Sequence, residues 1–243
     1  MGDLRVLLGS GGIRGKERLD TYHEEVGRCF EECETVLFVP FAGANHDRKT
    51  ERMAQFTSPA GVELIGIHTF ENPVEAVESA DGVYVGGGNT FLLTRDLHRL
   101  DLIEPIRSLA LGGTPYMGVS AGANVAGPTM QTTNDMPIVE PISFSTFDIV
   151  PFQINPHYFS GSTFRLTDGD IKEHYGETRE DRLNEFHEQN GTPVLGLWEG
   201  AYLRWDGHTG LLTGNDATIH KPDDDPLVVC PGTKLTGDLK PIE

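Results

Sequence analysis

The feature that most constrains the fold is a serine flanked by glycines, in the sequence Gly-Val-Ser-Ala-Gly at 118–122. The apolar residues 115–119 are typical of a buried strand, and residues 121–126 can begin a helix. In a strand that passes into a helix through Gly-x-Ser-x-Gly, the turn admits only small residues beside the serine and exposes its hydroxyl above the sheet edge. The pattern predicts a nucleophile elbow at Ser120; a tight turn beside a small-residue helix is the alternative.

Short apolar segments alternate with helical patterns along the first half of the chain. We expect strands over residues 4–8, 35–40, 62–67, 82–85 and 115–119, and helices over 22–33, 73–80 and 90–98. Continuous apolar strands that alternate with helices indicate a parallel sheet covered on both faces. Residues 144–154 and 194–212 look like strand pairs. We therefore predict a three-layer α/β fold whose central sheet is mixed and mostly parallel, within one domain over residues 1–243.

A serine hydroxyl needs a base to take its proton and an acid to orient that base. His157 is the best candidate base, because it follows an apolar segment and Pro156 makes the backbone before it rigid. A partly buried structural histidine is the alternative. Asp135, in a polar loop, and Glu199, after an apolar strand, are both candidate acids. We prefer Asp135 as the residue that orients His157 and keep Glu199 as its rival.

Three glycines, Gly86 to Gly88, lie between a predicted strand and a predicted helix. They lack the Gly-x-Gly-x-x-Gly spacing of a dinucleotide site. Glycines do allow the backbone to pass close to a reacting carbonyl, so an N–H of Gly87 or Gly88 could form an oxyanion hole with that of Ala121. We favour Gly88 with Ala121, and expect Asn89 to line the cleft. An ordinary glycine turn is the alternative.

These motifs, together with residues 123–129, 132–138 and 176–180, resemble peptidase family S51, the family of the α-aspartyl dipeptidases. The resemblance covers nearly the whole chain. It implies a serine-type dipeptidase that hydrolyses Asp-X dipeptides through a Ser-His-acid triad and an acyl-enzyme. The fold it implies is like that of class I glutamine amidotransferases and of flavodoxin.

The resemblance also implies a substrate-binding role for Arg179, which lies in the family block associated with aspartate recognition. A guanidinium can bind a carboxylate through two parallel hydrogen bonds. The residues alone indicate only a charged helix start, with a capping box of Thr178 and Asp181. The segment 160–170 is longer than the usual family connection, so the lid over the pocket is expected to differ.

Two other functions are compatible with the sequence. One is a cyanophycinase-like β-aspartyl peptidase of the same clan, which would need an anionic pocket for arginine; Arg179 argues against it. The other is a catalytically silent relative that binds acidic amino acids, against which the intact pair of Ser120 and His157 argues. We expect no metal and no cofactor, because no metal-ligand or phosphate-loop spacing is present.

Charge and hydropathy restrict the partners. The net charge of −18 argues against nucleic acid or an anionic membrane, because a polyanion would be repelled. No apolar run approaches membrane-spanning length, and the first residues enter a strand rather than a signal peptide. We expect a cytoplasmic monomer or homodimer whose partner is a small peptide substrate.

Overall fold

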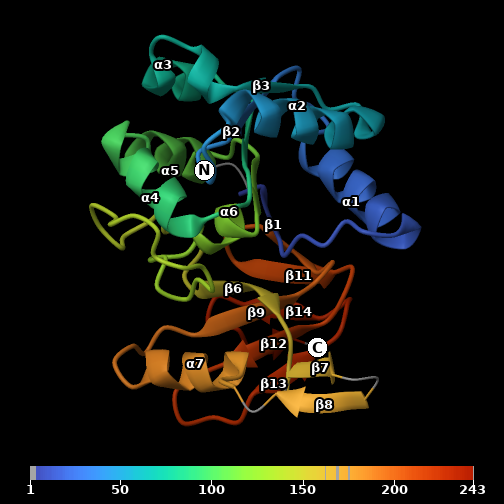
Figure 1. The fold of residues 1–243 in the computed structure, drawn as a ribbon. Coiled ribbons are helices and arrows are strands. Elements are labelled where there is room, and N and C mark those ends of the chain that lie inside the picture. The colour runs from blue at the N-terminus through green and yellow to red at the C-terminus, as the bar shows by residue number, and fades with distance from the viewer. Residues whose placement is uncertain (1–3, 162, 168–169, 175, 243) are drawn as a thin grey trace.

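A computed structural model describes residues 4–161, 163–167, 170–174 and 176–242. Its main sheet has nine strands in the order β15-β14-β11-β10-β1-β5-β4-β2-β3 (Figure 1). The five strands from β1 to β3 in that order are parallel, and the four from β10 to β15 continue the sheet in antiparallel fashion. The parallel strands are β1 (Val6–Gly9), β2 (Val36–Val39), β3 (Leu64–Gly66), β4 (Gly82–Val85) and β5 (Tyr116–Val119); the others are β10 (Tyr202–Trp205), β11 (Thr209–Thr213), β14 (Lys234–Thr236) and β15 (Pro241–Ile242).

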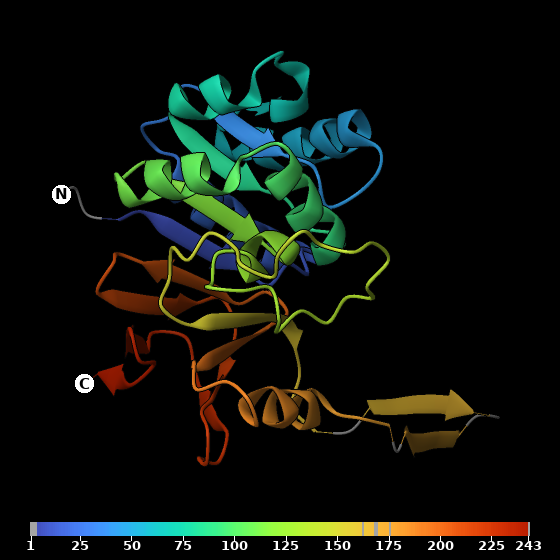
Figure 2. The ribbon, with the colours of Figure 1, turned by 90° about the vertical axis from the view of Figure 1, so that its left-hand side faces the viewer.

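A second sheet of four strands lies beside the main one, in the order β13-β12-β9-β6. Its strands are β6 (Gln153–Tyr158), β9 (Val194–Trp198), β12 (Ala217–His220) and β13 (Leu227–Val229). A separate hairpin, β7 (Thr163–Thr167) and β8 (Asp170–His174), extends away from the rest of the molecule (Figure 2). It holds most of the long 160–170 segment, whose expected effect on a lid stays a prediction.

Helices cover both faces of the parallel strands, as their alternating side chains require. Along β1, Leu7 packs in a cluster with Tyr22 and Val26 of α1, while Leu8 belongs to the cluster that includes Leu97 of α4. The helices are α1 (Lys16–Cys29), α2 (His46–Thr57), α3 (Pro73–Glu78), α4 (Thr90–Arg99), α5 (Ile103–Leu111), α6 (Ala121–Asn124) and α7 (Arg179–His187), with short 3-10 turns at Ser58–Ala60 and Ile67–Thr69. No helix in the described ranges is long and apolar enough to span a membrane.

The α/β fold with a mixed central sheet is confirmed, and each predicted parallel strand is present. The strand pair expected over 144–154 is wrong, since only residues 153–158 form a strand there. The backbone N–H groups of Phe147, Asp148 and Ile149 donate instead to carbonyls just after α6. The sequence also missed α2 and α5, and the division of the strands into two sheets.

Candidate active site

Ser120 occupies a sharp turn between β5 and α6. Its backbone is left-handed, with φ of 57° and ψ of −115°, and its N–H donates to the carbonyl oxygen of Gly9 at 2.9 Å. Side chains do not fit around this turn: a Cβ on Gly118 would lie 2.2 Å from the carbonyl oxygen of Gly122, and one on Gly122 would lie 2.0 Å from that of Val85. Both glycines of the motif are therefore required by the packing of the turn.

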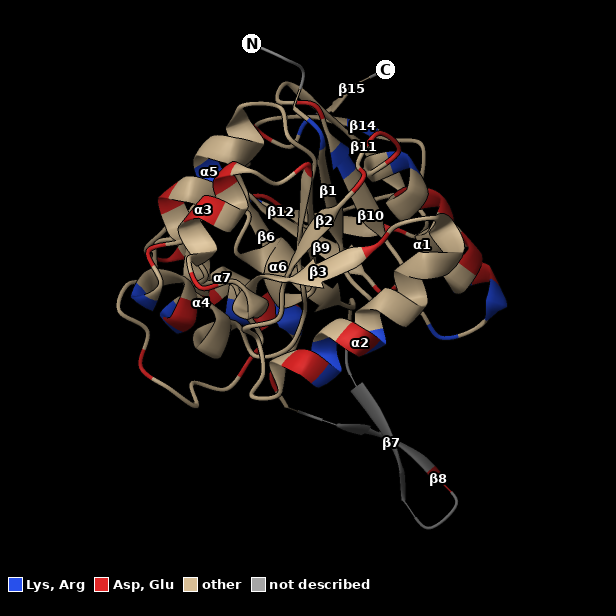
Figure 3. Cartoon of the chain, turned by 90° about the horizontal axis from the view of Figure 1, so that it is seen from above, with Lys and Arg blue, Asp and Glu red and all other residues tan. Residues whose placement is uncertain are grey.

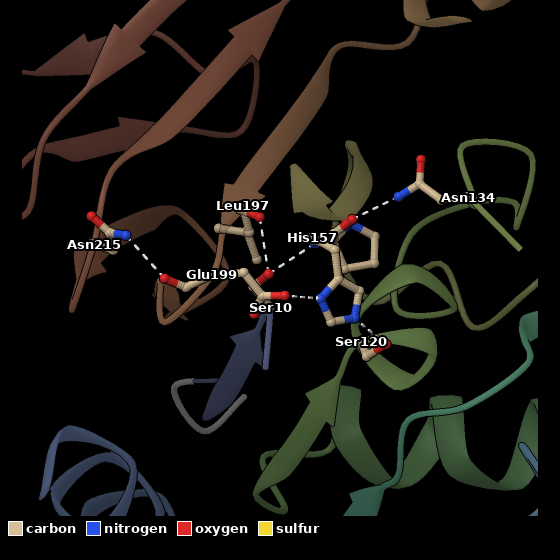
Figure 4. A network of polar contacts seen from close by, with 8 residues as sticks. Ser10, Ser120, Asn134, His157, Leu197, Glu199 and Asn215 are labelled. Carbon is tan, nitrogen blue, oxygen red and sulfur yellow. Dashed lines mark hydrogen bonds and ion pairs between the residues drawn. The ribbon is translucent and has the colours of Figure 1, made fainter. Parts of the chain in front are cut away.

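A chain of hydrogen bonds runs from Ser120 through His157 to Glu199 (Figure 4). The Ser120 hydroxyl lies 2.8 Å from Nε2 of His157, and Nδ1 of the same ring lies 2.7 Å from Oε1 of Glu199. The hydrogen bond with His157 is the largest influence on Glu199 and lowers the pKa of its carboxyl. An ionised Glu199 accepts a hydrogen bond from Nδ1–H of His157, which leaves Nε2 free to accept a hydrogen bond from the serine hydroxyl.

The backbone of His157 is held from two sides. Its φ is 55°, and its N–H donates to the hydroxyl of Ser10 at 2.8 Å. The Ser10 hydroxyl in turn donates to the carbonyl oxygen of Leu197 at 3.0 Å, and Asn134 donates to the carbonyl oxygen of Pro156 at 2.7 Å (Figure 4). Ser10 was not among the residues predicted from the sequence. Its signal was a serine within a glycine-rich turn directly after a strand.

Asp135 forms no hydrogen bond with His157 in the described part of the chain. Glu199 occupies that position, so the preference for Asp135 as the orienting acid is corrected. Oδ2 of Asp135 accepts from the backbone N–H and from the hydroxyl of Thr90, each at 2.7 Å. These bonds attach the loop before β6 to the start of α4. Asp135 therefore satisfies donors at a helix N-terminus, where a carboxylate is favoured.

The glycines after β4 bring the backbone beside Ser120. A Cβ on Gly87 would lie 2.9 Å from the Cβ of Ser120, and Gly88 has φ of 140°. Within the described residues, the backbone N–H groups of Gly88 and Ala121 donate to no hydrogen-bond acceptor. Ala121 directly follows the half-buried Ser120, and Gly88 directly follows Gly87, which lies against Ser120. Two donors without an acceptor in such positions are what an oxyanion site requires.

Asn89 and Arg179 differ in how far their side chains are engaged. Asn89 is the N-cap of α4: it accepts from the N–H of Leu92 at 3.0 Å and donates to the carbonyl oxygen of Met136 at 2.9 Å. Asn89 thus stabilises the start of α4. Its place in the cleft stays a prediction.

Arg179 is the first residue of α7, after the predicted capping box of Thr178 and Asp181, which is present. Its guanidinium lies 5.3 Å from the ring centre of Phe159, two residues after His157. Its Nε is buried and has no hydrogen-bond partner among the described residues. Burial, and after it the charge of Arg182, lower its pKa, whereas Asp135 opposes the shift. A partly buried cation with an unsatisfied donor is a suitable site for an anion.

Nothing in the described ranges brings together three or more His, Cys, Asp or Glu side chains in an arrangement that could hold a metal ion.

Comparison with known proteins gives a consistent match. The sequence pattern of peptidase family S51 matches residues 5–213. Peptidase E of Streptomyces coelicolor is 46% identical over 235 residues, which cover 95% of this chain and 93% of that protein. A probable alpha-aspartyl dipeptidase of Drosophila melanogaster is 40% identical, with 95% of each chain covered. A crystal structure of a peptidase from an acI-B1 actinobacterium has a TM-score of 0.67 at 17% identity, covers 96% of this chain and 97% of that one, and shows a similar fold.

Proposed function

We infer that this chain, which belongs to peptidase family S51 and is a serine peptidase, hydrolyses dipeptides with an N-terminal aspartate. The observation that carries the proposal is the hydrogen-bond chain from Ser120 through His157 to Glu199. It combines a nucleophile, a base and an orienting acid, each within hydrogen-bond reach of the next. The relatives of this protein include proteins named peptidase E and a probable alpha-aspartyl dipeptidase.

In the proposed mechanism, Oγ of Ser120 attacks the carbonyl carbon of the substrate aspartate, and its proton passes to Nε2 of His157. Glu199 stabilises the imidazolium that forms. The N–H groups of Gly88 and Ala121 donate to the oxyanion of the tetrahedral intermediate, a kind of interaction worth about 10²–10³ in rate. As the peptide C–N bond breaks, His157 gives its proton to the leaving amine and an aspartyl ester of Ser120 remains. Water, deprotonated by His157, hydrolyses that ester, and the serine regains its proton.

Arg179 supplies the proposed selectivity for aspartate. The substrate side chain carries a carboxylate, which a protein with a net charge of −18 repels unless a local cation compensates. The buried, unpartnered Nε of Arg179 and its place beside Phe159 support this role. Arg182, the next cation on α7, is less suited because it already pairs with Glu177 at 3.3 Å.

The proposal is tested by measuring hydrolysis of Asp-Leu, Asn-Leu, Glu-Leu, β-Asp-Leu and Ala-Leu by the purified protein. Asp-Leu should be cleaved with the highest kcat/KM, and a folded Ser120→Ala variant should fall close to the uncatalysed background, since loss of a nucleophile costs many orders of magnitude. Preferred cleavage of β-Asp-Leu would indicate a β-aspartyl peptidase instead. Binding of aspartate without cleavage of any dipeptide would indicate a silent relative.

A further inference from the structure

A cavity of about 210 Å³ adjoins the candidate active site on the side of helices α1 and α2. Gly11, Gly87 and Val119 form the wall nearest the site. A Cβ on Gly11 would lie 3.2 Å from Cε1 of His157, and one on Gly87 would lie 3.3 Å from Oγ of Ser120. The cavity therefore begins where the scissile bond of a bound peptide would lie.

Size and lining suit a single amino acid. Sites for drug-sized ligands measure roughly 300–1,000 Å³, so 210 Å³ corresponds to a smaller ligand. Phe38, Met53 and Phe56 supply apolar surface, while Lys49 and Arg52 supply positive charge. An apolar pocket with a few convergent polar groups is typical of a binding site for a small molecule.

Lys49 is positioned by a contact next to the nucleophile. Its Nζ donates to the carbonyl oxygen of Gly87 at 2.7 Å, which uses one of its three protons. Burial, followed by the charge of Arg52, lowers the pKa of Lys49. In the part of the chain that the structure describes, no carboxylate forms an ion pair with Lys49 or Arg52. Two cations at one cavity without a carboxylate partner favour an anionic ligand.

The position of the cavity indicates which part of a substrate it would accept. Arg179, the proposed partner of the aspartate side chain, is in α7, and Asp135 links the neighbouring loop to α4. Helices α1 and α2 lie on the other side of α6 from α4 (Figures 1 and 3). A peptide whose aspartate points toward Arg179 would thus direct its leaving residue toward the cavity.

We propose that this cavity binds the leaving residue of the dipeptide, with Lys49 and Arg52 pairing with its free α-carboxylate and Phe38, Met53 and Phe56 contacting an apolar side chain. The inference rests on the proposed function and adds the selectivity for the second residue. It restricts the enzyme to dipeptides, because a peptide bond replaces the free carboxylate in any longer peptide. It also favours leucine or phenylalanine over lysine, whose side chain would add a third cation to the cavity.

The test compares Asp-Leu with aspartyl-leucinamide, in which the terminal carboxylate is masked. Wild type should cleave the amide with a kcat/KM about 10- to 100-fold lower, a smaller loss than for a fully buried charge pair because Arg52 is exposed. Lys49→Met should lose a similar factor with Asp-Leu and little with the amide. Arg48→Met is the matched control, since Arg48 is an exposed cation of the same helix, and it should behave as wild type.

Equal loss of both substrates in Lys49→Met would mean that Lys49 only supports Gly87, and would overturn the proposal. So would equal cleavage of the two substrates by wild type, a result that needs no variant to fold. Lys49→Gln serves as a second variant if Lys49→Met is unstable by circular dichroism.

If the proposed function is wrong, wild type will cleave no Asp-X dipeptide, and this result differs from every outcome that overturns the cavity proposal. Calorimetry with L-leucine and L-leucinamide tests the cavity in that case. Tighter binding of L-leucine that is lost in Lys49→Met supports the site, whereas equal binding of the two ligands overturns it.

Discussion

Ser120 and His157 both have a left-handed backbone, with φ of 57° and 55°, and neither is a glycine. Such conformations cost of order 1–3 kcal/mol each and persist only where the surroundings hold them. Both are held by the end of β1: Gly9 accepts from the N–H of Ser120, and Ser10 accepts from that of His157. Two adjacent residues thus fix the nucleophile and the base relative to each other.

The first prediction separates the two candidate acids. Glu199→Gln should lower kcat for Asp-Leu by about 10³–10⁴ with little change in KM, because an amide cannot hold the required tautomer of His157. Asp135→Asn should change kcat much less and instead lower the free energy of unfolding by about 0.5–2 kcal/mol, the usual cost of losing a helix cap. Steady-state kinetics and urea unfolding measure the two effects. The opposite ranking of the kcat values would assign the orienting role to Asp135.

The second prediction concerns Arg179. Arg179→Met should reduce kcat/KM for Asp-Leu by roughly 2–5 kcal/mol of transition-state binding, the cost of removing one partner of a buried charge pair. The loss for Asn-Leu should be much smaller, since that substrate has no side-chain charge. Arg182→Met, which removes an exposed cation of the same helix, is the control. Equal losses for Asp-Leu and Asn-Leu would contradict a role in aspartate recognition.

At this scale, the sequence could predict Ser120 and His157 because each has a local signal: small residues around one, and an apolar segment and a proline before the other. The local signals do not decide the acid, because Glu199 follows an apolar strand and Asp135 lies in a polar loop, and either position suits an orienting carboxylate. Which carboxylate meets Nδ1 depends on the direction of the His157 ring, which the left-handed backbone and the hydrogen bond to Ser10 determine. The hydrogen bond between His157 and Ser10 joins residues 147 positions apart, so only the fold reveals it.

At the scale of elements, β6 and β9 place the base and the acid. These strands pair in parallel, and their register becomes irregular between Asn155 and Tyr158, at the residue that carries the imidazole. Glu199 follows β9 and precedes β10, which belongs to the main sheet. The acid is therefore on the short connection between the two sheets, close to the end of β6.

The third prediction concerns the neighbouring strand β12. His220 is buried, its Nε2 lies 2.9 Å from the hydroxyl of Tyr158, and burial, then His187, lower its pKa to about 4. An unfolded histidine has a pKa of about 6.5. Between these values the unfolded chain binds the additional proton, so stability should fall as the pH is lowered through this window.

Urea unfolding at several pH values between 7 and 4 measures this dependence. His220→Gln should reduce the loss of stability on acidification, because glutamine does not titrate and can still bond to Tyr158. An unchanged slope in His220→Gln would show that other groups dominate.

The elements that the sequence missed lacked strong periodic signals. Helix α2 is largely polar, and its clearest marker is the N-cap Asn45, which accepts from the N–H of Arg48 at 2.9 Å. Because α2 was not predicted, the position of Lys49 beside the cavity was not predicted either. Residues 144–154 were expected to form a strand pair because they include Phe147, Ile149, Val150 and Phe152, which are buried. They lie in a loop, and the N–H groups of residues 147–150 bond to carbonyls just after α6. Apolar composition indicates burial, but the partners of the backbone decide between strand and loop.

At the scale of the whole molecule, the site depends on the packing of the two sheets. Ser120 follows a strand of the main sheet, and His157 belongs to the second. One continuous apolar cluster includes side chains from both, such as Leu8 and Leu195. Separation of the sheets would break the hydrogen bond between Ser120 and His157, so we propose that the chain folds as one domain.

The last prediction follows from the charge of the molecule. Figure 3 shows acidic residues along α1, α2 and α3, and the net charge is −18. Self-repulsion of this kind destabilises a compact state, and salt screens it, since the Debye length falls from about 10 Å at 0.1 M to 3 Å at 1 M. The Tm should therefore rise between 0.05 and 1 M NaCl, by about 2–4 °C for each kcal/mol gained.

The exposed run from Asp223 to Asp225 provides the matched variant. Changing all three to Asn takes the net charge from −18 to −15, since −18 + 3 = −15. Asparagine also tolerates the left-handed backbone at Asp223, whose φ is 63°. The variant should have a higher Tm than wild type at low salt and a smaller increase with NaCl. Equal slopes for the two proteins would mean that salt acts through the hydrophobic effect rather than by screening, because that contribution does not depend on the charge removed.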